Sequence, residues 1–164
     1  MDTLKQLREE LTAEYNTTKK FLDEFPEGKN DYTPHEKSMK LMHLAQHITE
    51  IFGWPAHMLK TEGLDFAEGD KPELYETRQQ LEDAFEKNYA ESMKALEGAT
   101  EADLEPNWFL AYQGNKLAEW TKYAAIRHAL SQVTHHRAQL GVYYRLNDIK
   151  VPGSYGPSAD EQKF

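Results

Sequence analysis

The sequence predicts an all-α fold, an up-and-down four-helix bundle with long helices and an irregular C-terminal tail. Four long stretches space their apolar residues with helical periodicity, and no strong strand-like alternation of apolar and polar residues interrupts them. The chain has 164 residues, 39% of them hydrophobic, which suffices for one buried core. We therefore expect a single helical bundle domain over residues 1–164, without internal repeats.

The first predicted helix occupies the N-terminal segment and ends near Pro26 and Gly28, which interrupt its pattern. A loop over residues 29–34 follows. Apolar positions three, four and seven apart form one stripe, and the charged residues lie elsewhere. The stripe consists of Leu4, Leu7, Leu11, Tyr15, Thr18 and Leu22.

The second predicted helix begins at His35 or Glu36 and continues until Gly53, after which a Gly/Asp-rich loop extends to Asp70. The third opens with Pro72, because proline is tolerated in the first turn of a helix, and ends at Gly98. Apolar residues at helical spacing support both predicted helices; those of the second helix come first in the following list and those of the third helix come after them. They are Met39, Met42, Leu44, Ala45, Ile48 and Ile51, then Leu74, Leu81, Phe85, Tyr89, Met93 and Leu96.

Residues 100–115 interrupt the helical pattern with a proline, several aromatic residues and a turn at Gly114–Asn115. We expect an extended excursion there. The fourth and longest helix should cover Leu117 to Leu146, and the irregular tail starts at Val151.

The charge, apolar pattern and cysteine content of the chain exclude several classes of function and site. The formal net charge is −9, and residues 61–107 hold 14 acidic and 4 basic side chains, so a phosphate-neutralising nucleic-acid binder is not expected. No apolar run is long enough to span a membrane, and the N-terminus lacks an apolar signal region, which predicts a cytoplasmic protein. With no cysteine, a metal ion must be held by histidine, carboxylate, amide or water.

The histidines are concentrated on two of the predicted helices. His43 and His47 are four residues apart on the second helix, so they share a face and can chelate one metal ion. On the fourth, His128, Gln132 and His136 occupy successive turns of one face. Positions eight residues apart are about 12 Å apart along the axis, so His128 and His136 cannot share one ion. The alternative to a metal site is that these histidines are ordinary hydrogen-bonded residues. Trp54, Trp108 and Trp120 could line a pocket, and the alternative for them is packing in the core.

Two segments together resemble a known family. Residues 34–47, PHEKSMKLMHLAQH, resemble the second-helix motif of the DinB-like (YfiT-like) metalloenzymes, and residues 134–148, THHRAQLGVYYRLND, resemble their fourth-helix motif. The ending VPGSYGPSADE is also similar. The resemblance implies a four-helix bundle, usually a homodimer, with a divalent metal bound by three histidines.

Carried over by position, the metal ligands implied by the resemblance are His47, Gln132 and His136. Gln132 stands where the family has its middle histidine, which is the main departure from the pattern. Three outcomes stay open. Gln132 contributes its carbonyl oxygen as a weak third ligand; His43 or His135 substitutes for it; or the metal is lost and the bundle retained.

The resemblance implies a divalent-metal-dependent enzyme, with zinc or nickel as the expected ion. Relatives include thiol-dependent S-transferases, so a low-molecular-weight thiol or another small molecule is the expected partner, besides a second copy of the chain. His128 would then lie beside the ligands as a supporting or proton-handling group. The alternative is a non-catalytic dimeric binding or stress-response bundle with a degenerate metal site. The aromatic side chains of Tyr143, Tyr144 and Tyr155 could anchor the dimer interface.

Overall fold

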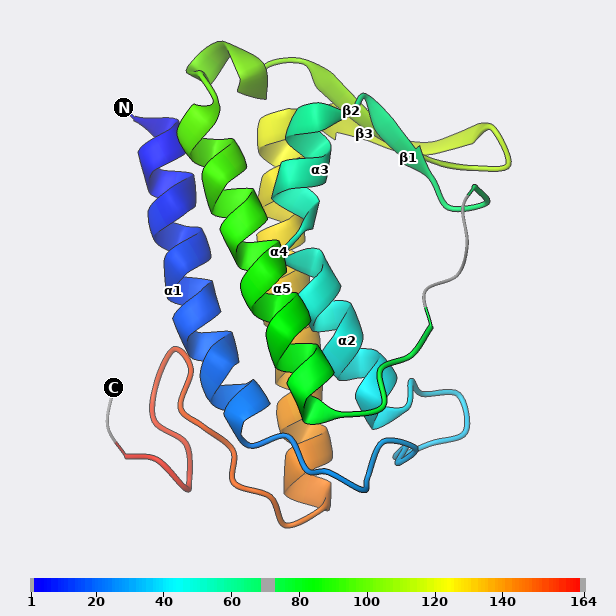
Figure 1. Cartoon of the computed structure of the whole chain (residues 1–164), viewed down its shortest axis with the longest axis vertical. Coiled ribbons are helices and arrows are strands. Elements are labelled where there is room, and N and C mark those ends of the chain that lie inside the picture. The colour runs from blue at the N-terminus through cyan, green and yellow to red at the C-terminus, as the bar shows by residue number, and fades with distance from the viewer. Residues whose placement is uncertain (1, 69–72, 163–164) are drawn as a thin grey trace.

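Four columns of helix lie side by side along the long axis of the molecule and enclose the apolar core (Figure 1). The computed structural model describes residues 2–68 and 73–162. The short helices α2 and α3 follow one another in a single column. In chain order, the helices are α1 (Thr3–Asp23), α2 (Leu41–Ile51), α3 (Trp54–Lys60), α4 (Arg78–Gly98), the 3-10 helix η1 (Glu101–Leu104) and α5 (Lys122–Leu146).

Helix α1 agrees with its prediction from the sequence. Its N-cap Asp2 accepts a hydrogen bond from the backbone N–H of Lys5, and the predicted stripe is the face that packs into the core. The chain leaves the helix just before Pro26, as the sequence predicted.

Helices α2 and α4 both begin later than predicted, because the chain caps them at other residues. The backbone N–H groups of Leu41 and Met42 donate to the carbonyls of Tyr32 and Asn30, so residues 35–40 stay outside α2. Thr77 and Gln80 form a capping box that starts α4 at Arg78. Pro72, the predicted start of this helix, lies outside the described residues.

The prediction of an all-α four-helix bundle is wrong, because a three-stranded mixed sheet covers one end of the helices (Figure 1). Strand β1 (Gly63–Asp65) pairs in parallel with β2 (Asn107–Tyr112), which pairs antiparallel with β3 (Asn115–Thr121). Gln113 and Gly114, both at positive φ, close the β2–β3 hairpin as a two-residue turn.

The sheet also corrects the start of the fourth predicted helix. Residues 117–121 belong to strand β3 and are not helical, and the Thr121 hydroxyl caps α5 by accepting from the N–H of Ala124. The expected extended excursion before this helix is confirmed as β2, preceded by the 3-10 helix.

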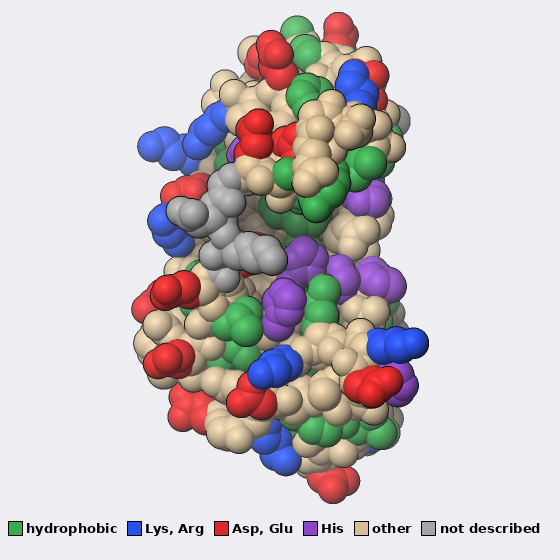
Figure 2. Space-filling model, turned by 90° about the vertical axis from the view of Figure 1, so that its right-hand side faces the viewer, with side chains coloured by type: hydrophobic (Ala, Val, Ile, Leu, Met, Phe, Trp, Pro, Cys, Tyr) green, Lys and Arg blue, Asp and Glu red, His purple; other side chains and the backbone are tan. Residues whose placement is uncertain are grey.

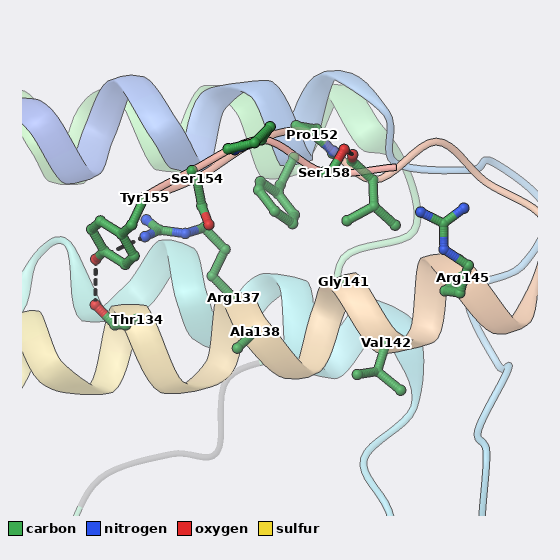
Figure 3. Close-up of a pocket in the computed structure, with 14 residues that line it drawn as sticks. Thr134, Arg137, Ala138, Gly141, Val142, Arg145, Pro152, Ser154, Tyr155 and Ser158 are labelled. Carbon is green, nitrogen blue, oxygen red and sulfur yellow. Dashed lines mark hydrogen bonds between the residues drawn. The ribbon is translucent and has the colours of Figure 1, made fainter. Parts of the chain in front are cut away.

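The C-terminal tail packs back along α1 and α5 instead of leaving the bundle. Between the tail and α5 lies an open cavity of about 370 Å³, in which the Tyr155 hydroxyl reaches both Thr134 and Arg137 (Figure 3). Tyr143 and Tyr144 are buried in the fold, where their hydroxyls donate to backbone carbonyls. Of the three tyrosines considered for an interface, only Tyr155 is exposed. Within the described ranges, no helix combines the length and apolarity needed to cross a membrane.

Candidate functional site

The predicted site lies between α2 and α5, which pack against each other. His47 on α2 and His136 on α5 bring their imidazole rings to a centroid separation of 4.7 Å, at an interplanar angle of 76°. The two residues are 89 positions apart in the sequence, so the packing of the helices alone brings them together. Two imidazoles bound to one zinc ion through 2.0–2.1 Å bonds place their ring centroids roughly 5 Å apart. The observed pair fits that arrangement.

In each ring, the Nδ1 atom faces a partner on its own helix. Nδ1 of His136 lies 2.8 Å from the amide oxygen Oε1 of Gln139 and donates to it when protonated. Nδ1 of His47 lies 3.8 Å from the Glu50 carboxylate, an ion-pair distance too long for a hydrogen bond. Metal-binding histidines characteristically engage their second nitrogen in this way, which leaves Nε2 to carry the lone pair.

The surroundings of His136 favour a neutral imidazole, and those of Glu50 favour a charged carboxylate. Burial lowers the pKa of His136 below its ordinary value, and the neighbouring His47 and His135 act in the same direction. Burial works against the charge of Glu50, but its contacts with His47 and Gln46 outweigh burial and lower the pKa of the carboxyl. Neutral imidazole is the form that binds metal.

Gln132 lies one helical turn before His136 on α5 and lines a cavity together with His47. Its amide nitrogen donates a 3.2 Å hydrogen bond to Nε2 of His128. An amide binds a metal ion through its oxygen. The hydrogen bond to His128 engages the amide nitrogen of Gln132, so it leaves the oxygen Oε1 available as a ligand. His47, Gln132 and His136 thus form a set of two strong donors and one weak donor.

His43 and His135, also considered as ligands from the sequence, play no comparable part. The ring of His135 lies 4.8 Å from that of His136, centroid to centroid, but the residue is exposed, as is His43 on α2. Across residues 2–68 and 73–162, no three His, Asp or Glu side chains are grouped as metal ligands. A third ligand comparable in strength to imidazole is therefore not assembled in this region.

A cavity of about 290 Å³ adjoins the ligand set, between the end of the helices and the sheet. Figure 2 shows histidine side chains gathered beside hydrophobic ones in the hollowed middle of one face. His57 on α3 and His128 on α5 both line the cavity, and burial lowers the pKa of His57.

The sequence interpretation missed His57, because it did not predict α3. The signal was present at Gly53–Trp54–Pro55. Pro55 cannot continue α2 since it lacks an N–H group, yet it suits the first turn of a new helix. That new helix would have placed Trp54 and His57, three residues apart, on one face.

Comparisons with known proteins agree with this fold. A sequence-family comparison matches residues 1–163 to the DinB family. The chain belongs to the DinB family. A comparison with curated proteins finds no match.

Two solved structures of DinB family members resemble the present structure. The DinB-like protein YjoA from Bacillus subtilis matches with a TM-score of 0.70 and 21% identity, over 96% of this chain and 99% of that one. A DinB-like protein from Bacillus cereus ATCC 10987 matches with a TM-score of 0.71 and 17% identity, over 93% of this chain and 99% of that one. At these identities, the likeness shows the shared fold.

Proposed function

We propose that this DinB family member is a divalent-metal-dependent enzyme whose ion, zinc or nickel, binds between α2 and α5. His47 and His136 are the strong ligands, and the carbonyl oxygen of Gln132 is the weak third. The supporting observation is the 4.7 Å approach of the two rings, each with its Nδ1 atom directed to a partner on its own helix.

The proposed reaction is an S-transferase activity, in which the sulfur of a low-molecular-weight thiol would bond to a carbon of the acceptor substrate while a leaving group departs from that carbon with the electron pair of the broken bond. A bound divalent ion lowers the pKa of a coordinated thiol and keeps it as the nucleophilic thiolate. The chain itself has no cysteine, so the thiol comes from a second substrate. His128, which accepts a hydrogen bond from the Gln132 amide, would support that proposed ligand, and the adjoining cavity would accommodate the acceptor substrate.

We also propose that the enzyme acts in the cytoplasm as a homodimer. Val142 and Leu146 are exposed apolar side chains on α5, and Tyr155 is exposed on the C-terminal tail. These side chains support a contact with a second copy of the chain. Light scattering at micromolar concentration should give twice the mass of one chain, and a monomer would refute the dimer.

Metal analysis of protein purified without a histidine tag tests the ion. After incubation with zinc, nickel or manganese and removal of the excess, we expect close to one equivalent per chain. Substitution His47→Ala or His136→Ala should abolish this binding. The control is His43→Ala, since this exposed histidine lies one turn away on the same helix. Less than about a tenth of an equivalent in the parent protein would refute the proposal.

A second candidate function is a non-catalytic binding module with a degenerate site. The observation that favours it is the donor set, in which an amide already bonded to His128 stands in for a third imidazole. The substitution Gln132→His distinguishes the two. If it creates tight binding where the parent protein has none, the module is supported. If the parent already binds as tightly as the variant, the enzyme is supported.

A further inference from the structure

All three tryptophans of the chain line a single cavity, the one beside the ligand set. They come from different elements: Trp54 from α3, Trp108 from β2 and Trp120 from β3. The sheet therefore supplies most of the aromatic wall, and helices α3 and α5 close the opposite side. Five further apolar side chains complete the lining: Met58, Leu64, Phe66, Leu110 and Ala125.

The aromatic side chains are held in place by their own contacts. The indole N–H of Trp108 donates to the Thr61 hydroxyl at 3.0 Å. Trp120 stacks on the ring of His128, with centroids 5.2 Å apart and planes 18° from parallel. Trp54 meets His47 edge-on at 5.7 Å. The walls are thus preformed, which reduces the entropy lost when a ligand binds.

The loop that carries Phe66 is fixed to the sheet by one carboxylate. Asp65 accepts hydrogen bonds from the backbone N–H groups of Ala67, Gln113 and Gly114, at 2.9, 3.0 and 2.6 Å. These bonds join the end of β1 to the turn of the β2–β3 hairpin. Phe66, the next residue, is 55% exposed and forms the rim of the cavity.

The chemistry of the lining determines which ligands it can accept. Charged residues make up 29% of the chain, yet none of the described residues that line this cavity is Lys, Arg, Asp or Glu. A larger open pocket beside α4 is different, because Lys60, Glu91, Lys94 and Asp103 line it. Without a bound metal ion, an ion entering the tryptophan-lined cavity would lose its hydration without gaining an opposite charge from the described lining residues.

Apart from the indole rings, the polar side chains among the described lining residues are three histidines and one glutamine: His47, His57, His128 and Gln132. His57 and His128 offer ring nitrogens that donate or accept according to tautomer, and Gln132 lies next to them. The volume, about 290 Å³, is at the low end for small-molecule pockets, which are typically 300–1,000 Å³. A suitable ligand therefore has one or two rings and a single hydrogen-bonding group.

We propose that this cavity binds a neutral, planar aromatic molecule, with its hydroxyl or carbonyl group directed to His57 and His128. As the substrate class of the enzyme, the assignment rests on the proposed function. Binding itself requires no metal, since the walls and the two histidines suffice. The ligand would lie beside His47 and Gln132, two of the proposed metal ligands.

The binding test uses coumarin, a neutral two-ring lactone, with the full chain labelled with 5-fluorotryptophan. Because every tryptophan lines the cavity, we expect all three ¹⁹F signals to shift saturably, with a dissociation constant below about 1 mM. In metal-free protein, the anion 2-naphthoate, of similar size, should bind at least tenfold more weakly. Absent or unsaturable shifts, or equal affinity for the anion, would overturn the proposal.

Variants locate the binding by calorimetry with unlabelled protein. Trp54→Ala and Phe66→Ala should each weaken coumarin binding about fivefold or more, because each removes an aromatic wall. The matched control is Tyr112→Ala, an exposed aromatic of β2 outside the lining. An equal loss in the control, or none in either wall variant, would overturn the assignment.

The same titration on His136→Ala separates this proposal from the metal proposal, because His136 is a proposed metal ligand that does not line the cavity. Coumarin binding that survives loss of metal binding supports the cavity on its own. Metal binding without coumarin binding refutes the substrate class and leaves the ion unaffected.

Discussion

The guanidinium of Arg137 on α5 and the carboxylate of Glu14 on α1 form an ion pair at 2.6 Å, with side chains only 2% and 7% exposed. The same guanidinium also donates to Thr18 and to the hydroxyl of Tyr155 (Figure 3). Tyr155 in turn donates to the second oxygen of Glu14. A buried cluster of Glu14, Thr18 and Arg137 thus joins two helices, and the exposed Tyr155 ties the C-terminal tail to it, next to the proposed ligand His136.

Removing the charge of Glu14 should strongly destabilise the fold. Glu14→Gln leaves the Arg137 guanidinium buried without its counter-charge, so we expect the free energy of unfolding to fall by about 3–5 kcal/mol. Urea denaturation measures the loss. Glu10→Gln is the matched control, since Glu10 pairs with Arg127 on the same two helices but both side chains are 38% exposed. That control should cost less than about 1 kcal/mol. Similar losses in the two variants would contradict the interpretation.

Gly63 permits the close approach of β1 to β2. A Cβ atom at this position would lie 2.6 Å from atoms of the Phe109 ring on the paired strand. Gly63→Ala should therefore displace that ring and lower the free energy of unfolding by about 1–3 kcal/mol. In a Phe109→Leu background the same change should cost less. Equal costs in the two backgrounds would refute the steric cause, and Gly98→Ala, with open space around it, serves as the control.

Tyr15 should make stability depend on alkaline pH. Burial, followed by its 2.6 Å hydrogen bond to Glu86, raises the pKa of Tyr15 to about 12. The unfolded chain ionises this hydroxyl near pH 10, so the contribution is complete below pH 10 and is lost as the pH rises through 12. Urea midpoints of Tyr15→Phe should therefore fall less steeply from pH 10 to 12 than those of the parent protein. Exposed Tyr112→Phe should follow the parent, and a parallel fall in Tyr15→Phe would exclude this linkage.

Gln139 should act on metal binding through the orientation of His136. Gln139→Leu removes the acceptor that holds Nδ1 of the ring, so we expect the metal affinity to fall about 10–100-fold. Competition with a chromophoric chelator measures the affinity, and circular dichroism checks the fold. Gln79→Leu, an exposed glutamine that bonds to Asp83 on α4, should leave the affinity unchanged. An unchanged affinity in Gln139→Leu would remove this residue from the site.

The helices were predictable wherever a periodic stripe coincided with a clear terminus. In α1 the leucine spacing and Pro26 define both the buried face and the end. The start of α4 instead depends on the hydrogen bonds of Thr77 and Gln80, which apolar spacing does not report. The sheet escaped prediction for a related reason. Strand β1 has three residues, and β3 carries the 65% exposed Leu117, so neither strand shows a clean alternation.

The proximity of His47 and His136 followed from the family motifs and not from spacing, since no pattern within one helix predicts a partner on another. The sequence offered a pocket lined by the three tryptophans as an alternative to packing, but its place in the fold could not be predicted without the sheet. Two of its tryptophans reach it only because β2 and β3 pair above α5. Because the sheet was not predicted, the residues of β2 and β3 that lie near the histidines could not be predicted either. The histidines themselves were assigned to the helices on which the structure has them.

The separation of the cavity into two walls has an evolutionary consequence. The proposed ligands belong to helices whose other faces build the core, so substitutions there are constrained by folding. The hairpin lies between α4 and α5 in the chain and contributes mainly side chains such as Trp120 to the opposite wall. Relatives can therefore exchange residues in the hairpin and acquire new substrates while the chemistry on the helices is inherited unchanged.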